Sequence, residues 1–174
     1  FAMGYRAAEP PAPVISKVFI NPGGLLDLIP ANAPFWRAIG PEIERAKALE
    51  GGSKGYELWP DLEVKPEDLI VVKNRYSAFI QGSSNLEQVL RERGIDTVLI
   101  TGTVTNVCCE STARDAMMLN FKTVMITDGN AAVTDDDHNA SLVGFYLIFG
   151  DIMSTDFAID CLKRNAQKGL AAAE

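Results

Sequence analysis

The sequence predicts a three-layer α/β/α sandwich built on a mostly parallel central sheet. From residue 69 onward, short runs of consecutive apolar residues alternate with segments of helical periodicity. Strands that are apolar on both faces are typical of a parallel sheet covered by helices on both sides. The chain has 174 residues, 47% of them apolar, which predicts one domain over residues 1–174 with a single core.

The predicted elements become regular only after residue 66. Before that point we expect one buried strand, Val14–Ile20, and then a surface excursion over 25–66 that proline residues interrupt. Ser84 and Glu87 have the spacing of a capping box at the start of a helix that Gly94 would end. The other predicted strands are Leu69–Lys73, Thr97–Thr101, Lys122–Thr127 and Asp151–Ser154, and the other main helices are Val107–Asn120, Asp135–Phe149 and Thr155–Gln167.

Composition and charge argue against several classes of partner. The net charge is −7 and the sequence contains no run of basic residues, so we expect no nucleic acid and no anionic lipid surface as a partner. The longest apolar stretch, Leu142–Gly150, is shorter than the roughly 20 residues that cross a bilayer. The odd number of cysteines, 3, without a secretory segment predicts a reducing, cytoplasmic setting.

The single histidine, His138, limits the metal chemistry that we expect. A zinc site built on two or more imidazoles needs more histidines than this sequence contains. The glycine-rich motifs that bind nucleotide phosphates are also missing from the sequence. We therefore expect no metal and no cofactor.

Two residues at predicted strand ends are candidates for chemistry, because open parallel sheets bind ligands at the carboxyl ends of their strands. Lys73 ends an apolar strand, and the alternative is a lysine at a solvated strand end. Cys108 falls in the first turn of a helix, where free amides and the helix dipole favour a thiolate and can hold an oxyanion. The alternative for Cys108 is a small buried hydrophobe, which is what we expect of its neighbour Cys109.

Two linked motifs around these residues resemble those of the isochorismatase-like cysteine hydrolases. The first motif is KNRYSAF over 73–79, and the second is TGTVTNVC over 101–108, continued by ESTARDA over 110–116. The resemblance extends over roughly residues 56–156. It implies the isochorismatase-like hydrolase fold and an Asp–Lys–Cys catalytic triad.

The resemblance also implies roles for single residues. Cys108 matches the family's nucleophile, and Lys73 matches its lysine. A cis peptide bond is implied between Thr103 and Val104. It would turn the backbone N–H groups of Val104 and Cys108 toward the oxyanion that forms during attack.

The triad aspartate has no matching position. The family's aspartate ends the first strand, whereas residues 13–19 resemble the second strand and residues 6–8 the end of the helix before it. We therefore expect the acid-bearing strand to lie upstream of Phe1 or to be missing from this chain. Asp27 is the nearest acid in a loop, but its leucine-rich context does not match the family pattern.

Other polar residues are weaker candidates. Arg75 and Tyr76 follow Lys73 and are predicted to orient a polar substrate, the alternative being a solvated loop, and Asn21 is a further candidate for substrate contact. The remaining residues are expected to be structural: Arg114 and Asp115 as an ion pair, Asp128 at a strand end, and His138 at the surface or an interface.

The function that these patterns favour is hydrolysis of a C–N bond. Within the family, the members that cleave the ether of isochorismate lack this cysteine, and the nicotinamidases bind a metal through several histidines. The resemblance therefore implies a cysteine amidohydrolase acting on a small amide or ureido acid through a thioester, as in the ureidoacrylate or N-carbamoyl branch, and a homo-oligomer. One alternative is an inactive binding or scaffold protein without the aspartate. The other is a redox protein using Cys108 and Cys109, although adjacent cysteines form strained disulfides.

Overall fold

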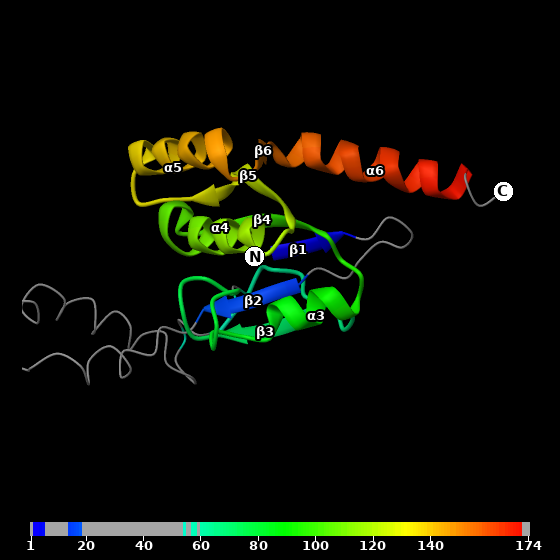
Figure 1. Ribbon diagram of the computed structural model, residues 1–174, viewed down its shortest axis with the longest axis horizontal. Coiled ribbons are helices and arrows are strands. Elements are labelled where there is room, and N and C mark those ends of the chain that lie inside the picture. The colour runs from blue at the N-terminus through cyan, green and yellow to red at the C-terminus, as the bar shows by residue number, and fades with distance from the viewer. Residues whose placement is uncertain (1, 6–13, 19–53, 55–56, 59, 172–174) are drawn as a thin grey trace, which may run out of the picture.

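The computed structural model describes residues 2–5, 14–18, 54, 57–58 and 60–171, with side chains described within 54–165. These residues form a sheet with the strand order β3-β2-β1-β4-β5-β6 (Figure 1). The strands are β1 (Ala2–Tyr5), β2 (Val14–Val18), β3 (Leu69–Lys73), β4 (Thr97–Thr103), β5 (Lys122–Ala131) and β6 (Asp151–Met153). The helices are α3 (Leu86–Glu92), α4 (Glu110–Met118), α5 (Asp135–Ile148) and α6 (Thr155–Ala171), with the π-helical turn η2 (Thr105–Cys109) before α4.

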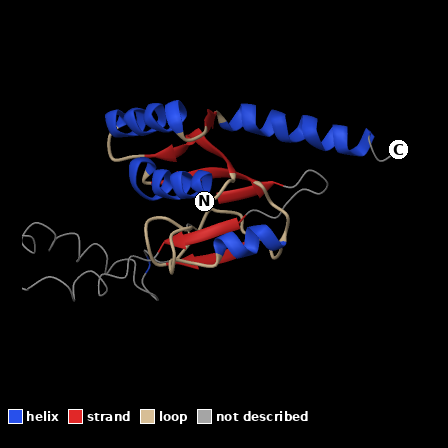
Figure 2. Cartoon of the chain, in the orientation of Figure 1, coloured by secondary structure: helices blue, strands red, loops and turns tan. Residues whose placement is uncertain are grey.

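The predicted α/β/α sandwich is confirmed, because helices cover both faces of the sheet (Figure 2). Successive residues of a strand point to opposite faces. In β4, Val98 and Ile100 join one apolar cluster with side chains from α3, α4 and α5. Leu99, between them, joins a second cluster with Ala158 of α6. The helices α3, α4 and α5 therefore form one outer layer and α6 the other.

The sheet is mostly parallel, as predicted, but it contains one strand that the sequence did not reveal. The pairs β2–β3, β4–β5 and β5–β6 are parallel, whereas β1 runs antiparallel to both β2 and β4. Strand β1 consists of the four residues Ala-Met-Gly-Tyr. This run is too short, and its residue types too varied, to give a recognisable strand pattern in the sequence. This strand places Ala2 opposite Ile100, toward the carboxyl end of β4.

The strand β3 departs from the expectation that its apolar run is buried on both sides. Ile70 and Val72 are each 51% exposed, whereas Val71 and Lys73 are buried. The burial of this strand alternates, as in a strand with one covered face. Lys73 therefore shares the face of Val71, which packs with α3, α4 and α5.

The start of α3 differs from the predicted capping box, and its end agrees. The N-cap is Asn85 without a side-chain cap, and Ser84 Oγ accepts a hydrogen bond from Leu86 N at 3.1 Å. Glu87 instead forms an i,i+4 ion pair within the helix. Gly94 adopts a φ of +63°, and its N–H donates to Arg91 O at 2.9 Å, so it ends the helix as predicted.

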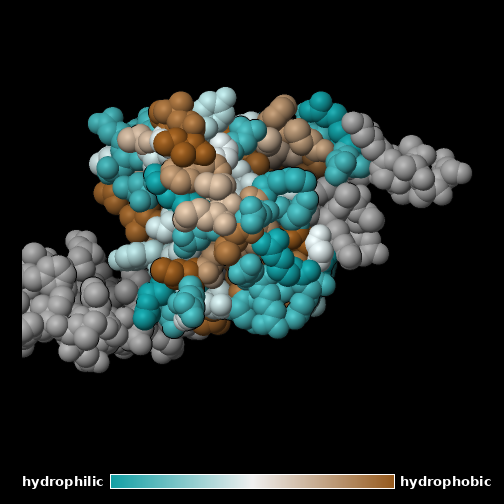
Figure 3. Space-filling model, in the orientation of Figure 1, coloured by the Kyte–Doolittle hydropathy of each residue, from teal (hydrophilic) through white to brown (hydrophobic). Residues whose placement is uncertain are grey.

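The carboxyl-terminal half of α5 exposes apolar side chains, whereas its first turn is acidic. Phe145 is fully buried, whereas Tyr146, Leu147 and Ile148 are exposed at 57%, 71% and 73%. Figure 3 shows hydrophobic side chains gathered over the carboxyl-terminal half of this helix and hydrophilic ones over its amino-terminal end. A helix segment that is apolar on both its inner and outer faces is typical of one with a further partner, and the expected homo-oligomer stays a prediction. Within the described part of the chain, no helix combines the length and apolar character that crossing a membrane requires.

We predict opposite effects for alanine at two glycines near the end of α5. A Cβ at Gly150 would lie 2.8 Å from the ring of Phe145 and would also clash with Thr123 O, so Gly150→Ala should lower the free energy of unfolding by about 1–3 kcal/mol. Gly144 lies within α5, where an added Cβ would meet nothing within 4 Å, so Gly144→Ala should raise it by about 0.5–1 kcal/mol. Urea unfolding of the two variants tests the packing of this helix. Equal effects would contradict it.

Candidate active site

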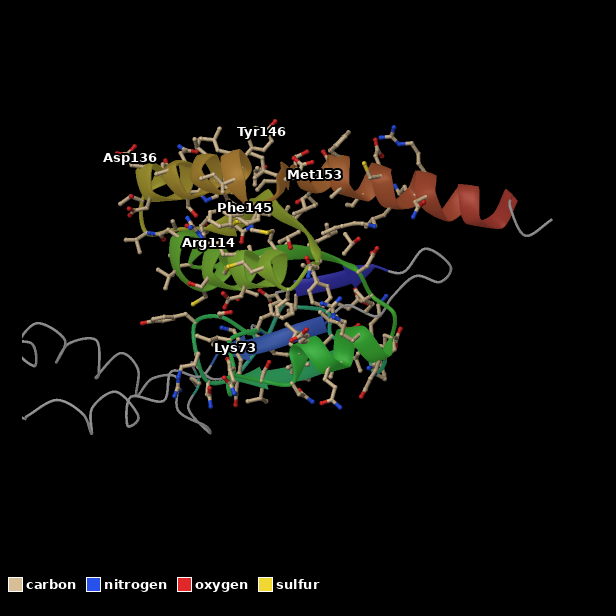
Figure 4. All side chains as sticks on the ribbon, in the orientation of Figure 1. Lys73, Arg114, Asp136, Phe145, Tyr146 and Met153 are labelled. Atoms are coloured by element: carbon tan, nitrogen blue, oxygen red, sulfur yellow. The ribbon has the colours of Figure 1, made fainter. Side chains whose placement is uncertain are left out.

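Lys73 carries its charge into the interior at the carboxyl end of β3. Its side chain is only 2% exposed, and Figure 4 shows it at the end of the strand rather than out in solvent. The alternative of a solvated strand end is therefore wrong. A buried ammonium is unfavourable unless polar groups replace its hydration, so its partners define the site.

Backbone carbonyls of the loop after β3 supply those partners. Lys73 Nζ donates hydrogen bonds to Tyr76 O at 2.7 Å and to Arg75 O at 3.0 Å. An ammonium has three donors, so these bonds leave one for a further acceptor. The loop therefore holds the ammonium through its main chain, a role that the sequence motif did not disclose.

The thiols of Cys108 and Cys109 lie within electrostatic reach of this ammonium. Burial lowers the pKa of Lys73 from 10.5 to about 8, and the charges of the two thiolates act in the opposite direction. The structure thus brings the predicted lysine and the predicted nucleophile together across the sheet. Among the described residues, no carboxylate contributes to the pKa of Lys73.

Cys108 lies in the turn η2, at the start of the helical segment that continues as α4. The carbonyl of Val104 accepts hydrogen bonds from Val107 N at 3.1 Å and from Cys109 N at 3.3 Å, and the second of these spans five residues. This wider turn replaces the first turn of the predicted α-helix, and such turns often occur at functional sites. Cys108 is partly exposed at the amino end of the helix.

Cys109 is buried, as expected for the neighbour of Cys108. Its side chain is 5% exposed and belongs to the apolar cluster beneath α4. Burial raises the pKa of the Cys109 thiol to about 11. The two adjacent thiols therefore have different chemistry, and Cys109 is a small buried hydrophobe.

The end of β4 shapes the turn that precedes Cys108. Gly102 has a φ of +128°, which glycine adopts without strain, and the peptide bond between Thr103 and Val104 is cis. The register between β4 and β5 shifts between Ile100 and Gly102. Asn130 Nδ2 bridges this irregularity with hydrogen bonds to Ile100 O at 2.9 Å and to Ile126 O at 2.6 Å. The pairing continues beyond the shift, so β5 runs four residues further than predicted, to Ala131.

His138, which we expected at the surface or an interface, also contacts the turn that carries Cys108. Its side chain is half-buried, and its Nδ1 lies 2.9 Å from the hydroxyl Oγ1 of Thr105. Thr105 is fully buried in η2, three residues before Cys108. The bond therefore joins the first turn of α5 to the turn that carries the thiol. The sequence offered no signal for it, since the two residues are 33 positions apart.

The ion pair expected of Arg114 exists with a different acid. Arg114 Nε donates to Glu110 Oε1 at 2.8 Å, one helical turn away, and not to the adjacent Asp115. Glu110 Oε2 accepts a hydrogen bond from Ser141 Oγ at 2.5 Å, and the guanidinium of Arg114 lies 4.0 Å from the ring centre of Phe149. These contacts fasten α4 to α5 and the segment after it, which is a structural role.

The other predicted residues are placed as follows. The side chains of Arg75 and Tyr76 are exposed beside the buried lysine, and Arg75 Nη1 donates to Asn74 O at 2.8 Å, so their contact with substrate stays a prediction. Asp128 is structural, since its Oδ1 accepts hydrogen bonds from Thr155 N at 2.7 Å and Thr155 Oγ1 at 2.8 Å at the start of α6. Asn21 and Asp27 lie outside the described residues.

No candidate metal site occurs among the described residues. No group of three or more histidine, cysteine or acidic side chains is close enough there to hold an ion. The described site offers a thiol, an ammonium and backbone amides.

We predict that iodoacetamide labels Cys108 faster than Cys109 or Cys161 near neutral pH. Cys109 is buried with a raised pKa, whereas Cys161 is partly exposed on α6. The contest is therefore between Cys108 and Cys161, and only Cys108 lies beside an ammonium at a helix start. Peptide mapping after brief labelling measures the order, and Cys161 reacting first would contradict this assignment.

We also predict a pH dependence of stability that comes from Lys73. Because its pKa is about 8 in the folded chain, below 10.5, the unfolded chain binds more protons between those two values. The free energy of unfolding should therefore gain up to about 3 kcal/mol from this group as pH rises through that window, and the gain should disappear as pH falls to 8.

The variant Lys73→Met keeps the length of the side chain and removes the charge. Urea unfolding of both proteins at several pH values isolates the contribution of Lys73, because other titrating groups are common to the two. Parallel profiles for the two proteins would mean that the ammonium is solvated.

Comparisons with known proteins identify the family of this chain. The family model described as isochorismatase domain matches residues 5–157. A ureidoacrylate amidohydrolase RutB of Pseudomonas savastanoi pv. phaseolicola is 39% identical over 117 residues, 67% of this chain and 46% of that protein. The protein of the same name from Caulobacter vibrioides is 36% identical over 144 residues, 79% of this chain and 61% of that protein. The chain thus spans about half the length of these curated relatives.

Solved structures show the same fold. A cysteine hydrolase from Pseudomonas syringae pv. phaseolicola superposes with a TM-score of 0.68 at 28% identity, over 90% of this chain and 72% of that one. N-carbamoylsarcosine amidase from Thermoplasma acidophilum superposes with a TM-score of 0.62 at 25% identity, over 82% of this chain and 72% of that one. The family match covers most of the chain and includes both Lys73 and Cys108. The chain therefore belongs to the isochorismatase family.

Proposed function

We propose that this chain is a cysteine-dependent amidohydrolase that cleaves a C–N bond of a small amide or ureido acid. The observation that carries the proposal is the buried ammonium of Lys73, on which the charge of Cys108 acts from the turn that follows β4. A cation close to a thiol favours the thiolate, which is the nucleophilic form. Few structural roles account for placing a lysine in that position.

In the proposed reaction, the Cys108 thiolate attacks the carbonyl carbon of the substrate. The carbonyl oxygen takes the negative charge, and the backbone N–H groups of Val104 and Cys108 are the proposed donors to it. The C–N bond then breaks, ammonia or an amine leaves with a proton, and the acyl group remains on the Cys108 sulfur, as a thioester from an amide or as a thiocarbamate from a ureido group. Water attacks this acyl group, which releases the acid product and restores the thiol. A carbamic acid released from a ureido group decomposes to carbon dioxide and an amine or ammonia.

The proton acceptor in this proposal is the aspartate that the family resemblance implies. The described residues offer no carboxylate in electrostatic contact with Lys73. That observation favours a second candidate function, an inactive binding or scaffold protein that retains the fold and the thiol. A turnover assay separates the two, since only the enzyme releases product.

The substrate class is proposed from the relatives and from the residues beside Lys73. The relatives named ureidoacrylate amidohydrolase and N-carbamoylsarcosine amidase have names that describe cleavage of a carbonyl C–N bond. The exposed guanidinium of Arg75 follows Lys73 by two residues, where it is the proposed partner for the carboxylate of an acid substrate. We therefore propose ureido acids as the first substrates to test.

We predict that the protein releases ammonia from ureidoacrylate or from an N-carbamoyl amino acid, and that Cys108→Ala abolishes the release. Lys73→Met should lower kcat by roughly a hundredfold or more, because a nucleophile needs its activating partner. Cys109→Ala is the matched control: it removes the neighbouring thiol from the core and should retain turnover per folded molecule.

Acid quenching during turnover, followed by mass spectrometry, should find the acyl group on the peptide that contains Cys108. Turnover that survives Cys108→Ala would contradict the cysteine mechanism. A folded protein without any turnover on these substrates would instead support the scaffold function.

A further inference from the structure

We propose that Thr112 is a positioning residue that sets the placement of the Lys73 loop relative to Cys108. The inference takes the roles of Lys73 and Cys108 from the proposed function, but it rests on its own set of hydrogen bonds. Thr112 lies in the first turns of α4 and is 5% exposed. Neither the composition nor the periodicity of the sequence distinguishes it from other threonines.

On one side, the Thr112 hydroxyl contacts the turn that carries the nucleophile. Its Oγ1 donates a hydrogen bond to the main-chain carbonyl of Cys108 at 2.7 Å. Threonines in helices commonly form such bonds to the carbonyl four residues earlier. By itself this bond is local and explains only how η2 joins α4.

On the other side, the same oxygen contacts the loop that holds the ammonium. Ala78 N donates a hydrogen bond to Thr112 Oγ1 at 3.2 Å, across 34 residues of sequence. The carbonyl of Tyr76 lies 3.4 Å from the hydroxyl and also accepts the 2.7 Å hydrogen bond from Lys73 Nζ. The hydroxyl therefore lies two contacts from the ammonium and touches the residue that bears the thiol.

A hydroxyl can form both hydrogen bonds of Thr112, the one to the Lys73 loop and the one to η2, whereas an apolar side chain of the same size can form neither. A hydroxyl accepts from one group while it donates to another, so one oxygen serves both Ala78 N and Cys108 O. Valine has nearly the same shape but serves neither, and water has little access to replace the hydroxyl because Thr112 and Ala78 are both buried. Without the hydroxyl, the loop and the helix still pack together, but no hydrogen bond fixes the position of Ala78 N relative to Cys108 O.

The test compares Thr112→Val with Thr112→Ser by the rate at which iodoacetamide labels Cys108. Thr112→Val should slow labelling at pH 7 about tenfold, because only the thiolate reacts and its ammonium partner is displaced. Thr112→Ser keeps the hydroxyl and should restore the wild-type rate. The matched control is Thr123→Val, which removes another buried hydroxyl, bonded to Phe121 O at 3.1 Å near the start of β5.

Combination with Lys73→Met separates positioning from general loosening of the structure. In the Lys73→Met background, Thr112→Val should cause no further slowing, because no ammonium remains to be positioned. Equal slowing in both backgrounds, or equal slowing by Thr123→Val, would overturn the inference. If Thr112→Val does not fold, slow labelling of a folded Thr112→Ser protein would overturn it and wild-type labelling would support it.

The outcomes also distinguish this inference from the proposed function. A wild-type protein in which Cys108 labels no faster than Cys161 would overturn both. Fast labelling of Cys108 in the wild type together with unchanged labelling in Thr112→Val would overturn only the role of Thr112.

Discussion

The burial of one ammonium group constrains the rest of the site. Lys73 ends an apolar strand, and its charge lies on the covered face of the sheet, where hydration is replaced by the carbonyls of Arg75 and Tyr76 and by the charge of nearby thiols. The chain must therefore turn back directly after β3 to present those carbonyls. The same loop is hydrogen-bonded to α4 through Ala78 and Thr112. The placement of the loop that holds the ammonium therefore also depends on the helix that follows Cys108.

Strand topology brings the two reactive groups to the same edge. β3 is parallel to β2, β4 is parallel to β5, and β1 runs antiparallel between β2 and β4, so β3 and β4 end on the same side of the sheet. Gly102 then permits the backbone turn that leads into η2, and His138 contacts this turn through Thr105. The site is thus formed by residues that follow two different strands, β3 and β4, and not by one motif alone. Sites at the carboxyl ends of strands are usual in open parallel sheets.

Much of this architecture was predictable from the sequence, because it depends on periodicity and on turn residues. The strand that ends at Lys73, the strand and helix around Cys108, and the end of α3 at Gly94 all have local signatures. The missed features are β1, the wide turn η2, the partner of Arg114 and the bonds of Thr105 and Thr112. A hydrogen bond between residues more than 30 positions apart leaves no periodic pattern in the sequence. For Arg114, the sequence offers both Glu110 and Asp115 as acidic partners, and only the folded helix shows which of them it contacts.

The pKa of Lys73, followed by NMR of isotope-labelled lysine, tests the central claim most directly. The account predicts titration near pH 8 in the wild-type chain, and a lower value in Cys108→Ala, because the charge of Cys108 raises the pKa that burial depresses. The Cys161→Ala variant is the control, since that thiol lies on α6 and does not act on Lys73. Titration of Lys73 near 10.5 in both the wild type and Cys108→Ala would contradict the account, because it would place the ammonium in solvent and away from the thiol.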